Sequence, residues 1–270
     1  MKIVVCIKQV PATDNATIDP VTKRIVREGL QSILNPFDLY AIEEAVRLRE
    51  KYGGEVIALS MGPEKAAVSL REAMAIGADS AVLLSDRAFG GSDTWATSYV
   101  LANAIKKIGG VDLVVCGKQA VDGDTAQVGP GIAAHLDFQQ AVYVSEIREY
   151  KNSLMTVERM NENGTDLCEL KLPAVLTVVK GINVPRVPTL KNVLAANAFE
   201  MPVWKPADIN ADLDKIGLDP SPTRVVKTEP PPPREGVSRR IEGTPAECAE
   251  KLITFLRQDG LIEEVGNGYR

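Results

Sequence analysis

Short apolar runs and amphipathic stretches alternate along the first half of the chain. Residues 3–7, 56–61, 81–84 and 111–116 are predominantly apolar, as in parallel strands that are covered on both faces. The stretches between them repeat apolar residues at helical spacing, and glycine pairs at 53–54 and 109–110 mark two of their ends. This order of elements predicts an α/β fold with a doubly wound, mostly parallel sheet.

Several predicted helices carry start signals. The first has Asn35 at the N-cap position, Pro36 at the first helical position and Asp38 in the first turn. Asp93 or Thr94 is predicted to cap the helix that follows the third strand.

The second half of the chain has a different pattern. Residues 142–147, 154–158 and 166–171 alternate apolar and polar side chains, with turn signals between them, which predicts an antiparallel meander. Residues 173–179 are more apolar and could rejoin the main sheet. A short helix is expected at 190–196, and little repeating pattern follows residue 200.

The C-terminal part contains a proline run and one amphipathic helix. Residues 228–235 read TEPPPPRE, which is typical of a stiff polyproline-like linker. Thr244 to Glu247 form a capping box, and the helix to residue 257 places Cys248, Leu252, Phe255 and Leu256 on one side. Because a lone helix cannot form a core, it must dock on the main domain or on another chain. We therefore predict a nucleotide-binding α/β domain at 1–200 and a partner-docking arm and helix at 201–270.

Composition removes several classes of function. The 270 residues carry a formal net charge of −5 with a pI near 5.2, so nothing favours nucleic acid as a ligand. No apolar run reaches the roughly 18 residues of a membrane span. The four cysteines form no C-x-x-C pair, which favours free thiols in the cytoplasm and argues against zinc. His135 is the only histidine, so triad chemistry is not expected and no catalytic side chain is assigned.

Residues 111–130, VDLVVCGKQAVDGDTAQVGP, form the most informative stretch. A strand, a glycine-rich loop and a helix start would point backbone N–H groups at a phosphate, although neither the dinucleotide fingerprint nor a Walker loop is present. Small residues would let a ligand approach, and the acidic residues suit ribose hydroxyls or an adenine amino group: Gly117, Gly123, Ala126, Gly129, Asp122 and Asp124. The alternative is an ordinary turn that Asp124 or Thr125 caps.

In doubly wound sheets, ligands gather beyond the carboxyl ends of the strands. The loops to consider are therefore 8–11, 61–62, 89–94 and 117–129. Two of them are rich in Gly, Asp and Thr, and this strengthens the nucleotide interpretation.

Several motifs, in order along the chain, resemble one family: KIVVCIKQVP at the N-terminus, NPFD at 35–38, GKQA at 117–120, LPAV at 172–175, and Pro185-Arg186 followed by Thr189-Leu190. Together they are similar to the beta subunit of electron transfer flavoproteins, over nearly the whole chain. The resemblance implies a Rossmann-like fold and an alpha subunit that holds a redox FAD in a mobile domain. It also implies a nucleotide in the beta subunit, which is AMP in the common class and a second FAD in the electron-bifurcating class.

The loop at 122–130 resembles the FAD-holding class, because Gly123, Ala126 and Val128 remove bulk where a pyrophosphate and ribityl chain would run. The loop at 86–94 also resembles that class, in which it lies near the flavin and the approach of NADH. The cofactor-binding residues that the resemblance implies are Cys6, Asn35, Asp38, Met61, Phe89, Gly90, Gly91, Asp93, Thr94, Thr97, Gly117, Lys118, Gln119, Asp122, Gly123, Asp124, Thr125, Ala126, Gln127 and Val128.

Each of these assignments has a purely structural alternative. Cys6 and Met61 could be core residues, Asn35 and Asp38 could only cap a helix, and Leu190 could be the first buried residue of a short helix.

The resemblance further implies that Pro188, Thr189 and Leu190 dock on a partner flavin dehydrogenase, such as an acyl-CoA or 2-hydroxy-acid dehydrogenase. The implied function is transfer of electrons from NADH to the alpha-subunit FAD and to a low-potential ferredoxin or flavodoxin. A structural AMP-binding beta subunit is the first alternative. An ATP-adenylating enzyme is a distant second, because no S-G-G-x-D-S loop follows the first strand.

Overall fold

The computed structural model describes residues 1–12, 32–226 and 240–262. The chain forms two compact units, Met1–Thr228 and Glu229–Arg270. The proline-rich stretch at 228–235 and most of the excursion after the first strand lie outside the described residues.

A nine-stranded sheet forms the centre of the first unit, in the order β11-β5-β4-β1-β6-β10-β7-β8-β9. Its strands are β1 (Lys2–Cys6), β4 (Glu55–Met61), β5 (Ser80–Leu84), β6 (Leu113–Gly117), β7 (Gln139–Lys151), β8 (Leu154–Asn161), β9 (Gly164–Lys171), β10 (Ala174–Val178) and β11 (Val203–Trp204). All neighbours are parallel except β7, β8 and β9, which pair antiparallel. The predicted doubly wound sheet and antiparallel meander are both confirmed, and the strand at 173–179 does rejoin the main sheet.

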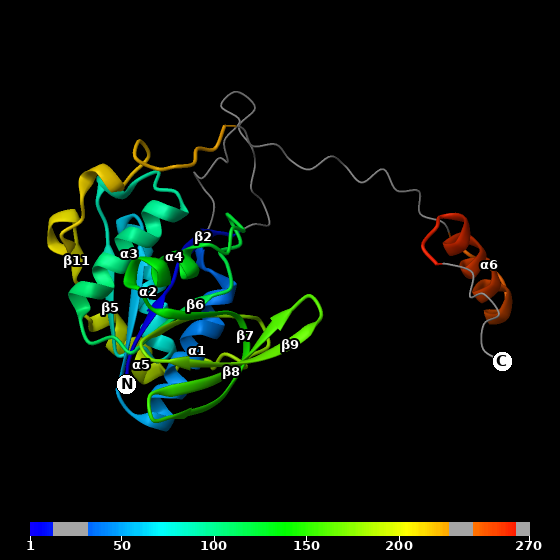
Figure 1. Ribbon diagram of the computed structural model, residues 1–270, viewed down its shortest axis with the longest axis horizontal. Helices are drawn as coiled ribbons and strands as arrows, with labels where there is room; N and C mark the ends of the chain where they lie inside the picture. Colours follow the sequence, from blue (N-terminus) through cyan, green and yellow to red (C-terminus); the bar gives the residue numbers. More distant parts are fainter. Residues whose placement is uncertain (13–31, 227–239, 263–270) are drawn as a thin grey trace. The chain divides into compact units, whose positions relative to one another are not determined.

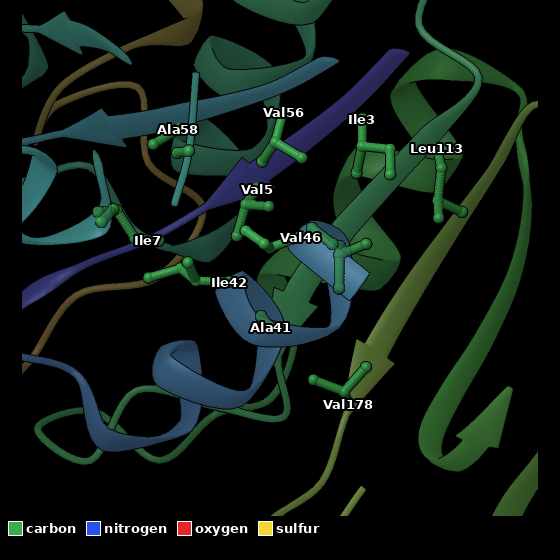
Figure 2. Close-up of a cluster of buried hydrophobic side chains, with 14 of the residues drawn as sticks. Ile3, Val5, Ile7, Ala41, Ile42, Val46, Val56, Ala58, Leu113 and Val178 are labelled. Atoms are coloured by element: carbon green, nitrogen blue, oxygen red, sulfur yellow. The ribbon is translucent and has the colours of Figure 1, made fainter. Parts of the chain in front are cut away.

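Helices cover both faces of this sheet (Figure 1). One face carries α1 (Pro36–Tyr52), α2 (Ala67–Ile76) and α5 (Leu190–Ala198), and the other carries α3 (Thr94–Ile108) and α4 (Val128–Leu136). Along β1, Ile3 and Val5 point to the first core while Val4 and Cys6 point to the second, because side chains alternate along a strand. Figure 2 shows the first core, in which side chains of β1 and β4 meet those of α1: Ile3, Val5, Val56, Ala58, Ala41, Ile42 and Val46.

Short elements complete the first unit. β2 (Gln9–Pro11) and β3 (Ser32–Leu34) form a separate antiparallel pair. Single 3-10 turns lie at Glu64–Ala66, Arg87–Phe89, Pro206–Ile209 and Leu213–Lys215.

The first unit extends past residue 200, where the sequence pattern becomes irregular. β11 pairs with the edge strand β5, and Ile209 and Ile216 are both 3% exposed in the second core. Burial of these two side chains joins the segment after β11 to the sheet.

The second unit contains α6 (Pro245–Gln258) with the predicted capping box of Thr244 and Glu247. No residue of α6 is buried within the part of the chain that the structure describes. Of the side chains expected on its apolar side, Leu252 is exposed and Cys248, Phe255 and Leu256 are partly exposed. Their docking on a partner stays a prediction. Among the described residues, no helix is long and apolar enough to cross a membrane.

Candidate functional site

A cleft of about 360 Å³ opens at the carboxyl ends of β1, β4 and β6. It lies at the switch point of the sheet, where the chain has added β4 and β5 on one side of β1 and then places β6 on the other. Ligand sites in doubly wound folds form at such points. The cleft walls are the loops after β1, β5 and β6 and Met61 at the end of β4, together with the N-terminal parts of α1, α3 and α4.

The structure brings nearly all of the predicted cofactor residues together in this cleft. Those that line it are Cys6, Asn35, Asp38, Met61, Phe89, Gly91, Asp93, Thr94, Thr97, Gly117, Lys118, Gln119, Gly123, Asp124, Thr125, Ala126, Gln127 and Val128. Gly90 and Asp122 do not line it. Gly90 is exposed at the end of the 3-10 turn Arg87–Phe89, and the Asp122 carboxylate pairs with Lys8 Nζ at 2.7 and 2.9 Å.

Asn35 connects three parts of the cleft floor. Its backbone is at the N-cap position of α1, but its side chain makes no capping hydrogen bond. Instead, Asn35 Nδ2 donates to Asp38 Oδ1 and to Gln119 O, both at 2.9 Å, and Asn35 Oδ1 accepts from Val121 N at 3.2 Å. The predicted N-cap position of Asn35 is confirmed, but its side chain does not cap the helix. It fixes the loop after β6 to the start of α1 instead.

Asp38 is the second part of this connection and is 5% exposed. Its Oδ2 accepts from Lys8 N at 2.7 Å. Burial raises the pKa of Asp38 to about 7, against the opposing effect of hydrogen bonds from Asn35, Lys8 N and Gly117 N. Asp38 therefore accepts hydrogen bonds from three separate segments, which are the loop after β1, the residue before α1 and the end of β6. Its role is larger than that of a residue that only stabilises the start of α1.

Gly117 allows α1 to approach β6. A Cβ at Gly117 would lie 2.4 Å from Asp38 Oδ1 and 2.7 Å from the carbonyl carbon of Phe37. Such distances are far below van der Waals contact, so only glycine fits. At Gly123, by contrast, an added Cβ would meet nothing within 4 Å.

The loop from Gly117 to α4 contains two residues in the left-handed region, Asp124 with φ 54° and Ala126 with φ 55°. Alanine adopts this conformation at a cost of about 1 kcal/mol, and such strain occurs often at ligand sites. The Gln119 side chain donates to the Asp124 carboxylate and supports this turn.

Neither Asp124 nor Thr125 caps α4, so the alternative of an ordinary turn capped by one of them is wrong. Gln127 is at the N-cap position and makes no capping hydrogen bond within the described chain. The first N–H groups of α4 therefore have no side-chain cap, and the N-terminus of this helix is open to an anionic ligand. Gly129 lets α4 pack closely here, since its Cβ would lie 2.4 Å from Thr177 Cγ2.

The opposite wall is formed by the start of α3. Asp93 caps this helix as predicted, because its Oδ1 accepts from Ala96 N at 3.0 Å. Burial acts to raise the pKa of Asp93, but hydrogen bonds from Ala96 and Thr223 outweigh it and lower that pKa below its ordinary value. Thr94 Oγ1 donates to Gln127 Oε1 at 2.8 Å and joins the two walls.

Two thiols lie at the base of the cleft. Cys6 and Cys116 are register partners on β1 and β6, and both are buried. The hydrogen bond with Cys116 and burial raise the pKa of the Cys6 thiol well above its ordinary value, so Cys6 stays protonated at neutral pH. Cys6 belongs to the second core, which confirms the core alternative; it also lines the cleft, and its contact with a cofactor stays a prediction.

Residues that the sequence analysis did not assign as cofactor-binding also line the cleft. Lys8, Ser92, Ala120 and Gly129 belong to the loops already considered, while Ile7, Leu101 and Cys116 lie outside them. Leu101 follows Thr94 and Thr97 at helical spacing, which is a signal that could have found it. Cys116 could have been found only from its pairing with Cys6, which strand order decides.

The predicted partner-binding residues lie in a different segment, before and within the first turn of α5. Pro188 and Thr189 are exposed, Leu190 is 75% exposed, and Thr189 Oγ1 caps α5 by accepting from Asn192 N at 3.2 Å. The alternative of a buried Leu190 is therefore wrong. Val184, Val187 and Leu194 are exposed nearby in sequence.

An ion-pair network holds this segment on α1. Arg186 binds Glu43 through Nε at 2.8 Å and Glu50 through Nη1 at 2.6 Å. Burial acts to raise the pKa of Glu43, but hydrogen bonds from Arg186 and Arg47 outweigh it and lower that pKa. Bidentate pairs of this kind fix geometry, so the exposed side chains after Arg186 are presented on an anchored backbone.

The sheet order and the cleft at its switch point define a doubly wound α/β protein of the Rossmann-like type. Residues 22–209 match the profile of the electron transfer flavoprotein domain. The chain is 47% identical over 263 residues to the electron transfer flavoprotein subunit beta of Thermoanaerobacterium thermosaccharolyticum, covering 97% of this chain and 100% of the relative. The chain therefore belongs to the electron transfer flavoprotein family, among its beta subunits, which pair with an alpha subunit.

Two further relatives have other names. The chain is 45% identical over 264 residues to the caffeyl-CoA reductase-Etf complex subunit CarD of Acetobacterium woodii, covering 97% of this chain and 100% of the relative. It is 43% identical over 279 residues to the protein FixA of Sinorhizobium fredii, covering 99% and 98% of the two chains.

Proposed function

We propose that this beta subunit binds FAD in the cleft and passes electrons from NADH to the FAD of an alpha subunit and to a low-potential acceptor. The observation that carries the proposal is the wall from Gly117 to Val128, which combines small side chains with the uncapped start of α4. Such a wall suits a pyrophosphate, because the start of α4 offers N–H groups and Gly117, Gly123 and Ala126 add little side-chain bulk. A cleft of about 360 Å³ is within the usual range of roughly 300–1,000 Å³ for ligand sites.

The protein groups have positioning roles in this proposal. The start of α4 would bind the phosphates, and Asn35 and Asp38 hold the loop that carries Gly117 to Gln119. Bound FAD would supply the redox chemistry, and the protein would supply orientation and electrostatics. Asp93 already occupies the N-terminus of α3. The first turn of α1 contains Pro36, which has no N–H, and the acidic Asp38. The dipole of α4 is therefore the one that best suits an anionic ligand.

AMP is the second candidate ligand, and one observation favours it. The cleft volume is near the lower end of the usual range, which suits a mononucleotide. In that case the beta subunit would have a structural role, and the redox flavin would belong to the alpha subunit alone.

We further propose that the exposed segment Pro188 to Leu190 docks on a partner flavin dehydrogenase, such as an acyl-CoA or 2-hydroxy-acid dehydrogenase. Leu190 is 75% exposed on a backbone that Arg186 anchors to α1, and a pre-ordered apolar side chain is a typical interface anchor. The relative CarD is named as part of a reductase complex. A ferredoxin or flavodoxin would be the low-potential acceptor, and α6 would dock on the alpha subunit through its exposed apolar side chains.

Nucleotide content tests the central proposal. The complex of alpha and beta subunits is purified, its absorbance spectrum is recorded, and its nucleotides are extracted and quantified. Two FAD per heterodimer supports the proposal, one FAD with one AMP supports the structural alternative, and ATP turnover would support an adenylating enzyme.

The double variant Ala126→Asn/Val128→Thr tests the steric argument. Asparagine tolerates the left-handed conformation of position 126 better than alanine, so the fold should persist. The longer asparagine side chain would fill part of the pyrophosphate path, and threonine would keep the shape of Val128 while adding a hydroxyl to it. We expect FAD occupancy of the beta site to fall by about tenfold or more. The matched control is Asp137→Asn, a second left-handed position at the exposed end of α4 outside the cleft. Full FAD occupancy in the double variant would show that the small side chains do not select the ligand.

A further inference from the structure

Residues 216–223, here called the strap, pack against the loop 88–93 that forms one wall of the cleft. Ile216 is 3% exposed and shares the second core with Phe89. A Cβ at Gly217 would lie 2.7 Å from Ala88 O, and a Cβ at Gly91 would lie 2.8 Å from Leu218 Cβ. The two segments therefore approach as closely as glycine permits, with both glycines at positive φ.

Hydrogen bonds connect the strap to two residues of the cleft wall, Ser92 and Asp93. Gly217 N donates to Ser92 Oγ at 2.8 Å, and Asp93 N donates to Ser221 Oγ at 2.9 Å. Ser221 is 8% exposed, and its hydroxyl donates in turn to Gly217 O at 2.6 Å. Thr223 donates to Asp93 Oδ2 through both its N, at 2.9 Å, and its Oγ1, at 2.8 Å.

These bonds fix the Asp93 carboxylate. Its Oδ1 caps α3 through Ala96 N, and its Oδ2 is occupied by Thr223. Without Thr223, Asp93 Oδ2 would lose both of these hydrogen bonds, and the Asp93 carboxylate could turn toward a ligand. A phosphate-bearing ligand would then be repelled. The wall would also have to be ordered when the ligand binds, at a cost in affinity.

We propose that Ser221 and Thr223 are positioning residues of the nucleotide site, and that the strap holds Ser92, Asp93 and Thr94 in the geometry that admits a phosphate-bearing adenine nucleotide. This inference rests on the proposed nucleotide-binding function and adds residues far along the chain to it. The strap follows the wall loop by more than 120 positions, since Ser221 and Asp93 are 128 residues apart.

The test uses the complex of alpha and beta subunits with the beta site emptied of nucleotide. Binding of AMP and of FAD is measured by equilibrium dialysis for the wild type, for Thr223→Val and for Ser221→Ala/Thr223→Val. Valine keeps the shape of threonine and the backbone N–H but removes the hydroxyl. We expect the double variant to bind the nucleotide about tenfold more weakly, and the single variant to lie between it and the wild type.

Two further variants separate positioning from general stability. Thr223→Ser restores the hydroxyl and should recover wild-type affinity. Asp208→Ala removes a comparable bond, from Lys205 N at 2.8 Å, in the same C-terminal part of the unit but outside the cleft. Its melting temperature should fall as in the strap variants while its nucleotide affinity stays unchanged.

The outcomes distinguish a failure of the proposed nucleotide-binding function from a failure of the strap inference. A wild-type complex that binds neither AMP nor FAD at the beta site overturns the proposed function and the strap inference with it. A wild type that binds, together with strap variants of equal affinity, overturns the strap inference alone. Equal loss of affinity in Asp208→Ala also overturns it, because the effect would then be one of stability.

Discussion

The close approach of α1 to β6 at Gly117 leads to a sharp prediction. In Gly117→Ala, the new methyl group would lie 2.4 Å from Asp38 Oδ1 and 2.9 Å from Asp38 N. Neither atom can retreat freely, since one belongs to backbone and the other is hydrogen-bonded to Asn35 at 2.9 Å. The start of α1 must therefore move away from β6, and the Asp38 carboxylate must lose part of its hydrogen bonding.

The magnitude follows from two contributions. Overpacking of a tight interior costs about 1–3 kcal/mol, and a buried polar group that loses its partner costs about 1–3 kcal/mol more. Together they predict a loss of roughly 2–6 kcal/mol in the free energy of unfolding. The matched control is Gly123→Ala in the same loop, which meets nothing within 4 Å and has no positive φ. It should change stability by less than about 1 kcal/mol.

Urea unfolding of both variants, followed by circular dichroism, measures this difference. Thermal melting should show a drop of roughly 10 °C for Gly117→Ala, because about 1 kcal/mol corresponds to roughly 2–4 °C in a chain of this size. If Gly117→Ala unfolds within about 1 kcal/mol of Gly123→Ala, the contact between α1 and β6 is looser than described. The same result would mean that the hydrogen bonds of Asp38 tolerate a side chain at position 117.

Two other predictions concern the docking segment and the buried carboxyl. Leu190→Ala should weaken affinity for the dehydrogenase by about thirtyfold, which corresponds to roughly 2 kcal/mol, while the melting temperature and the NADH–dye activity stay unchanged. The control is Leu213→Ala, because Leu213 is also exposed, at 63%. Unchanged partner affinity in Leu190→Ala would refute the docking role. Because the folded pKa of Asp38 is raised to about 7, its favourable contribution to stability is fully present below the unfolded value and is lost as pH rises through about 7. Between about pH 5.5 and about pH 8.5, the free energy of unfolding of the wild type should therefore fall by roughly 2 kcal/mol relative to that of Asp38→Asn. Urea unfolding of nucleotide-free protein measures this difference. Parallel pH profiles of the two proteins would contradict the raised pKa of Asp38.

Local patterns in the sequence determined the elements of this fold. The apolar runs gave the parallel strands, alternation gave the meander of β7 to β9, and start signals gave α1, α3 and α6. These features depend on neighbours in the chain, so the sequence contains them directly. The loops after the strands were also predicted as the site, because the carboxyl ends of parallel strands meet at one edge of a sheet. The closer assignment of residues came from the family resemblance.

Tertiary structure alone decided which groups meet. Asn35 has the position of a cap, yet its side chain binds Asp38 and Gln119 because the loop after β6 competes for its amide. Cys116 reaches the cleft because β6 is placed beside β1.

The strap shows the same limit at the longest range. Ser221 and Thr223 stand in a stretch without repeating pattern, and their partner Asp93 lies 128 and 130 positions earlier. Local propensity determines how a segment bends and which face is apolar, and these are properties of a few consecutive residues. Hydrogen bonds between distant segments depend instead on strand order and packing, so the three-dimensional structure was needed to find them.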